Sequence, residues 1–105
     1  MGDALRGRGY PLKHIKSLVR KGDVVIRDNA LASAWQDFGW DTKDILSAML
    51  KLKLAHFHKS DFSKTRVSVR LDFYRARGLN GENVFTHFYV DPDTGELVIN
   101  SFKRL

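Results

Sequence analysis

The sequence predicts an α+β fold, in which helices pack on one face of a small antiparallel sheet. In the first half of the chain, apolar residues recur at helical spacing between residues that begin and end helices. In the second half, apolar and polar residues alternate, and two tight-turn sequences separate the alternating runs, which indicates a meander. A chain of 105 residues falls within the usual size of one domain. We therefore expect a single domain over residues 1–105, with residues 1–9 flexible.

The first predicted helix lies in YPLKHIKSLVRKG, residues 10–22. Pro11 suits its first turn, and Gly22 suits the position just after its end. Spacings of three and four put its apolar residues on one inward stripe: Leu12, Ile15, Leu18 and Val19. Residues 24–26 are then expected to form a short extended connector.

Two further helices follow, each with an aspartate at its predicted N-cap. In RDNALASAWQDFGW this cap is Asp28, and Gly39 ends the helix. In DTKDILSAMLKLKL the cap is Asp41, and Asp44 three residues later forms a pair that resembles a capping box. The predicted buried stripes are Leu31, Ala34, Trp35 and Phe38 in the first, and Ile45, Leu46, Met49 and Leu50 in the second. The pattern then changes in LKLKLAHFH, and an extended segment is expected to begin near Phe57.

Three strands are predicted after that point. The run RVSVRLDFYRAR alternates over at least eight residues, and the Asn80-Gly81 pair after it is a strong hairpin signal. The other two strands are expected at 84–90 and 97–104, joined by the turn DPDTGE. Alternation groups Val67, Val69, Leu71 and Phe73 against Ser68, Arg70, Asp72 and Tyr74 in the first strand. It groups Val84, Thr86, Phe88 and Val90, expected to face the helices, against Phe85, His87 and Tyr89 in the second. In the third it groups Leu97, Ile99, Ser101 and Lys103 against Val98, Asn100, Phe102 and Arg104.

Positive charge is the first indication of function. The formal net charge is +6 and the pI is about 9.8. The charge is concentrated in residues 1–22, with six Lys/Arg and one acidic residue, and in residues 59–77, with six and two. Such blocks attract phosphates and polyanions, although basic faces also serve simply to keep a protein in solution.

Several classes of protein are disfavoured by composition. The chain has no cysteine, which excludes disulfides and thiolate metal sites. No apolar run approaches the roughly 20 residues that a membrane-spanning helix needs, so no membrane partner is expected. A reducing cytoplasm suits such a chain, and we predict a cytoplasmic location.

A metal site is a weak alternative. His56 and His58 are two residues apart in AHFHKSDF, so on a strand they would share a face, and His87 could supply a third ligand. The only acidic residue nearby is Asp61, and Lys59 beside the pair would repel a cation. We therefore predict no metal and no other cofactor.

The strands favour a phosphate-binding surface instead. Lys59 comes where the chain changes from helix to strand, and further cations follow on later strands. The cations are interleaved with Tyr74, Phe85 and Tyr89, and charge interleaved with aromatic groups on a sheet suits single-stranded nucleic acid. The alternative is that these aromatic residues are ordinary core and the charges ordinary cross-strand pairs. A DNA-binding domain is less favoured, because no helix pair carries a convincing recognition face.

Five segments, in order, resemble the MqsR-type toxins of bacterial toxin–antitoxin systems. They are LKHIKSLVRKGDVVIRDNAL, FGWDTKDILSAMLKL, FHKS, DFYRAR and VINSFKRL, and the resemblance spans nearly the whole chain from about residue 10. It implies a RelE-like fold. It also implies an mRNA interferase that cuts RNA without a metal and is neutralised by a zinc-containing, DNA-binding antitoxin. The expected partners are thus mRNA and an antitoxin, and whether the ribosome takes part is left open.

The resemblance also implies site residues. The family's FYKS lysine falls on Lys59, its terminal SFK lysine on Lys103, and its YRPR arginines on Arg75 and Arg77 after Tyr74. Other positions depart from the family pattern. Leu71 stands where the family has a glutamine, Phe85 where it has a tyrosine, His87 where it has a lysine, and His58 where it has a tyrosine.

Our hypothesis is that His87 replaces the missing tyrosine as acid/base, while Lys59, Lys103 and Arg75 hold the scissile phosphate. Arg77, Tyr74 and Tyr89 are expected to bind the RNA. The rival hypothesis is a catalytically silent module that keeps the toxin fold and binds only RNA or the antitoxin. The apolar side chains at positions 71 and 85 favour that rival.

Overall fold

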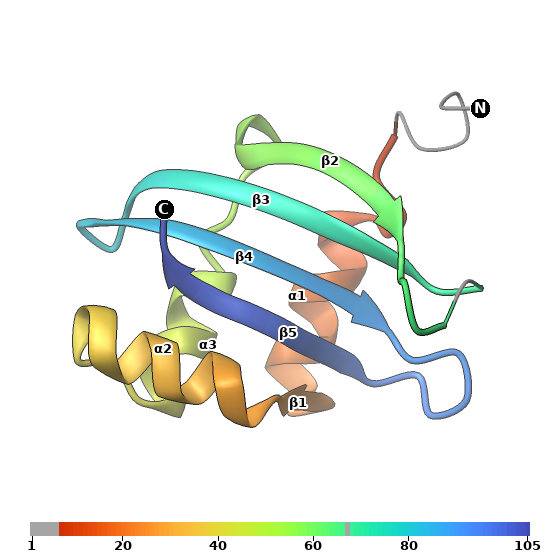
Figure 1. Cartoon of the computed structure of the whole chain (residues 1–105), viewed down its shortest axis with the longest axis horizontal. Helices are drawn as coiled ribbons and strands as arrows, with labels where there is room; N and C mark the ends of the chain where they lie inside the picture. The colour runs from red at the N-terminus through yellow and green to blue at the C-terminus, as the bar shows by residue number, and fades with distance from the viewer. Residues whose placement is uncertain (1–6, 67) are drawn as a thin grey trace.

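The computed structural model describes residues 7–66 and 68–105 and confirms the predicted α+β class (Figure 1). The helices come first in the chain, and the sheet follows in the order β1-β5-β4-β3-β2. The helices are α1 (Leu12–Lys21), α2 (Asp28–Phe38) and α3 (Thr42–Met49), with a short 3-10 helix at Leu54–His56. The strands are β1 (Val24–Ile26), β2 (Phe57–Phe62), β3 (Arg70–Leu79), β4 (Glu82–Val90) and β5 (Leu97–Arg104).

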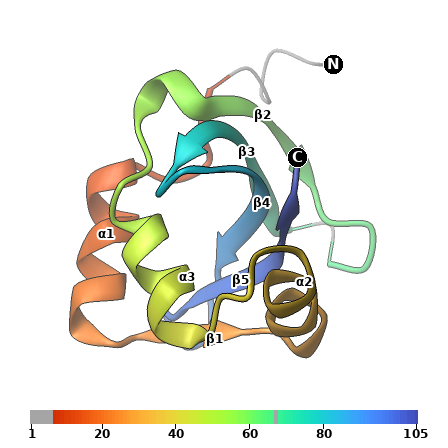
Figure 2. The ribbon, with the colours of Figure 1, turned by 90° about the vertical axis from the view of Figure 1, so that its left-hand side faces the viewer.

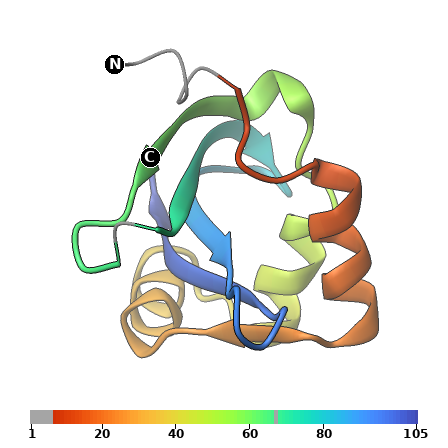
Figure 3. The same cartoon turned by 90° about the vertical axis from the view of Figure 1, so that its right-hand side faces the viewer.

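The sheet is curved, and α1 and α3 lie on its inner side (Figure 2). Viewed from the opposite end, α1 again lies across from the strands, while α2 lies along the β5 side (Figure 3). The core between these layers is built from apolar side chains of all three helices and of β3, β4 and β5. The side of the sheet that faces away from this core is called the outer face below.

The segment 24–26 is a strand rather than a simple connector. Val24, Val25 and Ile26 pair in parallel with Leu97, Val98 and Ile99, so β1 forms one edge of the sheet. The chain reverses between α1 and β1 because Gly22 adopts a left-handed conformation at φ 79°, which suits glycine. This crossover could not be read from the sequence, because a run of three apolar residues gives no periodicity.

The second helix corrects two predictions. Arg27, and not Asp28, is its N-cap. Asp28 is its first helical residue, so the helix begins one residue earlier than predicted. The prediction that Trp35 is buried is wrong, since its side chain is 65% exposed. The small residues Ala30 and Ala34 instead form the fully buried stripe, which lets the helix approach β5 closely.

The third helix begins as predicted. The Asp44 backbone N–H donates to the Asp41 carboxylate at 3.1 Å, and the Asp41 N–H donates to the Asp44 carboxylate at 3.0 Å. This reciprocal pair is a capping box and satisfies donors that the first helical turn leaves free. Of the predicted inward residues, Ile45 and Met49 are fully buried, while Leu46 and Leu50 pack at the edge of the core.

Both predicted turns are present. Asn80 and Gly81 have φ angles of 49° and 85°, the positive values that a two-residue hairpin of this type requires. The turn through Asp91 closes with an Asp91 N–H to Glu96 carbonyl bond of 2.8 Å, and β5 begins directly after it. The expected strands at 84–90 and 97–104 are therefore confirmed, the first with two more residues at its start.

The predicted grouping of side chains on β5 is wrong. Phe88 pairs with Ile99 and His87 with Ser101, so Asn100 is an extra residue between them. This β-bulge moves the later part of the strand by one position, which puts Phe102 in the core and Ser101 and Lys103 on the outer face. An unbroken alternation cannot describe a strand that contains such a bulge.

β3 begins at Arg70, so the predicted strand residues Ser68 and Val69 precede it, and Val67 lies outside the described residues. From Leu71 to Tyr74 the predicted alternation is present, but the polar-looking group faces the core. Asp72, Tyr74 and Ala76 are fully buried, whereas Leu71 and Phe73 are only partly buried on the outer face. Asp72 is satisfied there by hydrogen bonds from the Gly9 N–H at 2.7 Å and the Ser60 hydroxyl at 2.9 Å.

Asp72 also accepts a bond from the Tyr10 N–H at 3.1 Å, so the segment before α1 is fixed to the middle of the sheet. The Tyr10 hydroxyl adds a 2.7 Å bond to the Arg70 carbonyl. The predicted flexible segment 1–9 thus ends in a hydrogen-bonded Gly9, and residues 1–6 lie outside the described residues.

Candidate functional site

The outer face carries two transverse rows of side chains that run from strand to strand. The first row is formed by paired residues of β2, β3, β4 and β5: Lys59, Phe73, His87 and Ser101. The second row lies two residues further along and comes from β3, β4 and β5: Arg75, Phe85 and Lys103. Adjacent strands are about 4.8 Å apart, so each row places its charged and aromatic groups within reach of one ligand.

Aromatic contacts hold the groups of the first row. The Lys59 ammonium lies 4.9 Å from the centre of the Phe73 ring, and the His87 ring lies 4.7 Å from that same ring. In the second row the Lys103 ammonium lies 5.5 Å from the Phe85 ring centre. These cation–π contacts orient both lysines over aromatic faces while leaving them exposed.

His87 links the two rows. Its ring contacts Phe73 in its own row and Phe85 in the next, with 5.7 Å between the His87 and Phe85 ring centres. The amide nitrogen of Asn100 lies 3.3 Å from its Nδ1. Asn100 reaches the ring because it is the extra residue of the β5 bulge, an example of a bulge that redirects a side chain.

Burial among these rings determines the charge of His87. Desolvation, with a further contribution from the nearby Lys103 ammonium, lowers its pKa from 6.5 to about 4. Both effects disfavour the imidazolium form. At neutral pH the ring is therefore uncharged and can take up a proton.

The low pKa of His87 predicts a loss of stability in acid. Between pH 6.5 and about 4 the unfolded chain binds a proton at this position and the folded chain does not, so stability falls as the pH falls through this range. We expect wild type to lose about 1–3 kcal/mol more than His87→Gln on going from pH 7 to pH 4.5. Urea unfolding of the two proteins at both pH values measures this, and equal losses would contradict it.

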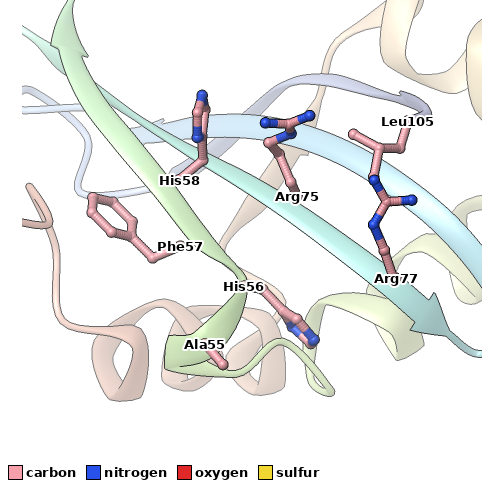
Figure 4. Close-up of a pocket in the computed structure, with 7 residues that line it drawn as sticks. All are labelled: Ala55, His56, Phe57, His58, Arg75, Arg77 and Leu105. Carbon is pink, nitrogen blue, oxygen red and sulfur yellow. The ribbon is translucent and has the colours of Figure 1, made fainter.

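His58 lies beside the two rows, a position that the sequence does not predict. The pairing of β2 with β3 shifts between Phe57 and Lys59, so His58 is the extra residue of a second bulge. Phe57 packs edge-to-face against Tyr74 at the border of the core, whereas His58 and Lys59 are both exposed. His58 projects to the same side as Arg75 and Arg77 (Figure 4). No sequence signal marks this bulge, because alternation alone would have placed His58 and Lys59 on opposite faces.

His58 helps to line two adjoining hollows. The first, of about 420 Å³, is bordered by residues of β2 to β5 and the C-terminus: His58, Arg75, Phe85, Lys103, Arg104 and Leu105. The second, of about 290 Å³, is drawn in Figure 4 and adds Ala55, His56, Phe57 and Arg77. Cations and aromatic rings meet at these hollows, as a phosphate-containing ligand with bases requires.

The histidine pair does not form a chelating site. His56 projects away from His58 in Figure 4, and its Nδ1 accepts a 3.0 Å bond from the Lys53 N–H. Within residues 7–66 and 68–105, no three His, Cys, Asp or Glu side chains are grouped as metal ligands.

The order of these residues along the chain also matches a known family. The family model described as motility quorum-sensing regulator, toxin of MqsA, matches residues 8–104. This chain belongs to the MqsR toxin family. It is thus a toxin of a toxin–antitoxin system, and its partner is an antitoxin. A search of curated proteins found no match to the chain.

The expected site residues of this MqsR-family toxin do not all lie in the two rows. Lys59, Arg75, His87 and Lys103 all belong to the two rows of the outer face. Arg77 is exposed one position beyond the second row and lines the hollow of Figure 4. Tyr89 is half-buried on the outer face but pairs with Val98, beyond the first row and away from both hollows.

Tyr74 does not belong to the site. Its side chain is fully buried between Phe57 and Phe88 in the core of the toxin. Burial, with the charge of Asp72, raises the pKa of its phenol to about 12. The prediction that Tyr74 binds substrate is therefore wrong, and the reason is the period of a strand: Arg75 points outward, so Tyr74, the residue directly before it, points inward.

Two positions that depart from the family pattern lie in or beside the rows. Phe85 lies within the second row, and Leu71 borders a separate hollow beside Lys59 and Phe73. Neither side chain can donate or accept a proton. In the described residues, no helix of the toxin is long and apolar enough to cross a membrane.

Proposed function

We propose that this toxin is a metal-independent endoribonuclease that cleaves single-stranded mRNA in the cytoplasm. The observation that carries the proposal is the neutral His87 ring, placed between an aromatic-supported lysine on each side. Lys59 and Lys103 supply charge for a phosphate, and Phe73 and Phe85 supply faces for bases.

Cleavage would use the 2′-hydroxyl of the RNA as nucleophile. His87 takes the proton from this hydroxyl, and the oxygen attacks the adjacent phosphorus. Lys59, Lys103 and Arg75 stabilise the negative charge that grows on the phosphorane. The leaving 5′-oxygen takes a proton from His58, which borders the same hollow as Arg75 and Lys103. The products are a cyclic phosphate and a 5′-hydroxyl. The step uses no metal and consumes no water.

Asn100 decides which nitrogen of His87 is free to act. If its amide oxygen faces the ring, it accepts a hydrogen bond from Nδ1–H, and Nε2 can then take up the 2′-hydroxyl proton. If its NH₂ faces the ring, Nδ1 accepts the bond and Nε2 carries the proton. The structure places the NH₂ toward Nδ1, so the base function proposed here requires the Asn100 amide to turn over into the first arrangement.

The cofactor and the partners follow from the same proposal. We propose no metal in the reaction, an mRNA substrate, and a zinc-containing, DNA-binding antitoxin. EDTA should therefore leave the cleavage of purified RNA unchanged, whereas a strong loss would support a metal-dependent reaction.

Lys103→Ala tests the role of the phosphate-binding lysines. We expect cleavage to fall by about 10–100-fold, less than for a buried donor because Lys103 is exposed. Lys43→Ala is the matched control, since Lys43 is an exposed lysine on α3 that borders none of these hollows. The measurement is the single-turnover rate on a labelled single-stranded RNA, and equal rates for the two variants would remove Lys103 from the site.

A silent module that only binds RNA or the antitoxin is the second candidate. The apolar Leu71 and Phe85 favour it, because they remove two polar groups of the family pattern from this face. Expression in bacteria separates the two functions. Growth arrest that the antitoxin reverses, and that His87→Ala abolishes, favours the nuclease. Harmless expression with retained RNA binding favours the module.

A further inference from the structure

A third hollow continues the two that border the candidate site. Its volume is about 420 Å³, and it lies between α1, the end of α3 and the β3–β4 turn. It shares His56 and Arg77 with the hollow of Figure 4, which in turn shares His58 and Arg75 with the hollow beside Lys103. The three hollows thus form one groove, called the basic groove here, that runs from β5 to α1.

The charged side chains that line the basic groove are all positive. Lys16, Lys51 and Lys53 border its far part, Arg77 its middle and Lys103 its near part, and no aspartate or glutamate lines any of the three hollows. Within residues 7–66 and 68–105, the salt bridges that form involve Arg66 and Arg104 only. Lys16, Lys53 and Arg77 therefore keep their charge available to a ligand.

The ring of His56 is affected by the positive charges in the groove and supplies a hydrogen-bond donor. Burial, followed by the charges of Lys53 and Lys16, lowers its pKa below the ordinary value. Its Nδ1 accepts the backbone N–H of Lys53, so the neutral ring carries its proton on Nε2. A neutral N–H donor next to two ammonium groups suits a phosphate oxygen and repels a metal cation.

We propose that the basic groove holds the sugar–phosphate backbone of single-stranded RNA as it leaves the cleavage site, with Lys16, Lys53 and His56 binding a phosphate remote from the scissile one. This inference rests on the proposed function and extends it. A linear polyanion fits because the three hollows adjoin and their charged side chains are all positive, whereas a small anion would occupy only one of the three hollows.

The test uses the double variant Lys16→Ala/Lys53→Ala and the control Lys13→Ala/Lys43→Ala. Both remove two exposed or half-exposed lysines, but Lys13 and Lys43 border no part of the groove. Binding is measured with a 2′-O-methyl RNA of about 15 nucleotides, near the upper site size of single-strand-binding folds, which cannot be cut because its nucleophile is blocked.

We expect the groove variant to bind this RNA about tenfold more weakly than wild type, with a salt slope smaller by roughly 1.4. In the control variant, the RNA affinity and the salt slope should change much less. With cleavable RNA, KM should rise and kcat should stay the same, since neither lysine touches the reacting phosphate. Shortening the RNA to a few nucleotides should remove the difference between wild type and the groove variant.

Failure of this inference is distinct from failure of the proposed function. If wild type cuts RNA but the two double variants bind it equally, the groove proposal is overturned and the nuclease stands. If wild type binds RNA through the groove without cutting it, the nuclease is overturned and the groove stands. If only antitoxin binding is lost in the groove variant, the groove serves the antitoxin and the RNA proposal is wrong.

Discussion

If the proposed nuclease is correct, replacing His87 with alanine is expected to lower kcat for RNA cleavage by about 10²–10⁴-fold, the range expected when a proton-transfer group is removed. The effect is large because the other groups of the two rows, Lys59, Arg75 and Lys103, are cations at neutral pH and cannot act as a base there. Single-turnover cleavage of a labelled RNA measures it. His14→Ala is the matched control, because His14 is an exposed histidine on α1. A rate close to wild type in His87→Ala would remove this residue from the mechanism.

The pH dependence separates a catalytic from a structural role for His87. Its pKa in the free protein is about 4, so kcat/KM should fall below about pH 5, where the ring takes up a proton and can no longer act as a base. Bound RNA brings a negative phosphate to the ring, which raises the pKa, so the acidic fall in kcat should begin at a higher pH. A merely structural histidine would produce neither fall, and the profile of His87→Ala provides the reference.

Asn100→Asp provides a second variant that keeps the imidazole. The carboxylate can only accept a hydrogen bond, so it fixes Nδ1–H and leaves Nε2 free. Its charge also stabilises the imidazolium, so the acidic fall in kcat/KM should move to a higher pH than in wild type. An unchanged profile would show that Asn100 does not control the state of His87.

Asp72→Ala is expected to lower the free energy of unfolding by about 3 kcal/mol. Asp72 is fully buried, and its carboxylate accepts bonds from the Gly9 and Tyr10 N–H groups and the Ser60 hydroxyl. Without it these donors lose their partner, and the segment before α1 loses the two backbone bonds by which Gly9 and Tyr10 attach it to Asp72. Urea unfolding measures the change, and hydrogen exchange should show faster exchange of the Gly9 and Tyr10 amides.

Two further variants keep the Asp72 prediction specific. Asp61→Ala is the control, because Asp61 is exposed on β2 and, among residues 7–66 and 68–105, its carboxylate bonds only to the neighbouring Phe62 N–H at 2.8 Å. Gly9→Ala tests the same contact from the other side, since a Cβ there would lie 2.9 Å from the Asp72 carboxylate. Equal stability of the Asp72 and Asp61 variants would show that the buried network contributes little.

The network around Asp72 also supports the site. Ser60 on β2 bonds to Asp72 on β3 in the core, and their neighbours Lys59 and Phe73 pair on the outer face. A polar contact on one side of the sheet thus fixes the register of charged and aromatic groups on the other. Repeating the cleavage assay with Gly9→Ala, which keeps the carboxylate, relates this anchoring to activity.

Local sequence signals determined much of the fold. The capping box of Asp41 and Asp44, the left-handed Gly22 and the Asn80-Gly81 hairpin each form because a few adjacent residues satisfy nearby backbone groups. The family also followed from the sequence, since it depends on the order of short segments along the chain. Such features need no information about distant residues.

The tertiary structure decided which face each side chain occupies. Tyr74 was expected to bind substrate and is buried, whereas Trp35 was expected in the core and is exposed. The periods of strands and helices allow more than one apolar stripe, and packing selects the stripe that is buried. The bulges at His58 and Asn100 bring one histidine beside Arg75 and the amide beside His87, and each adds one residue that no alternation pattern reveals. The sequence thus determined which groups the toxin carries and which family it belongs to. The pairing of distant strands determined that these groups meet on one face, because register is set by contacts far apart in the chain.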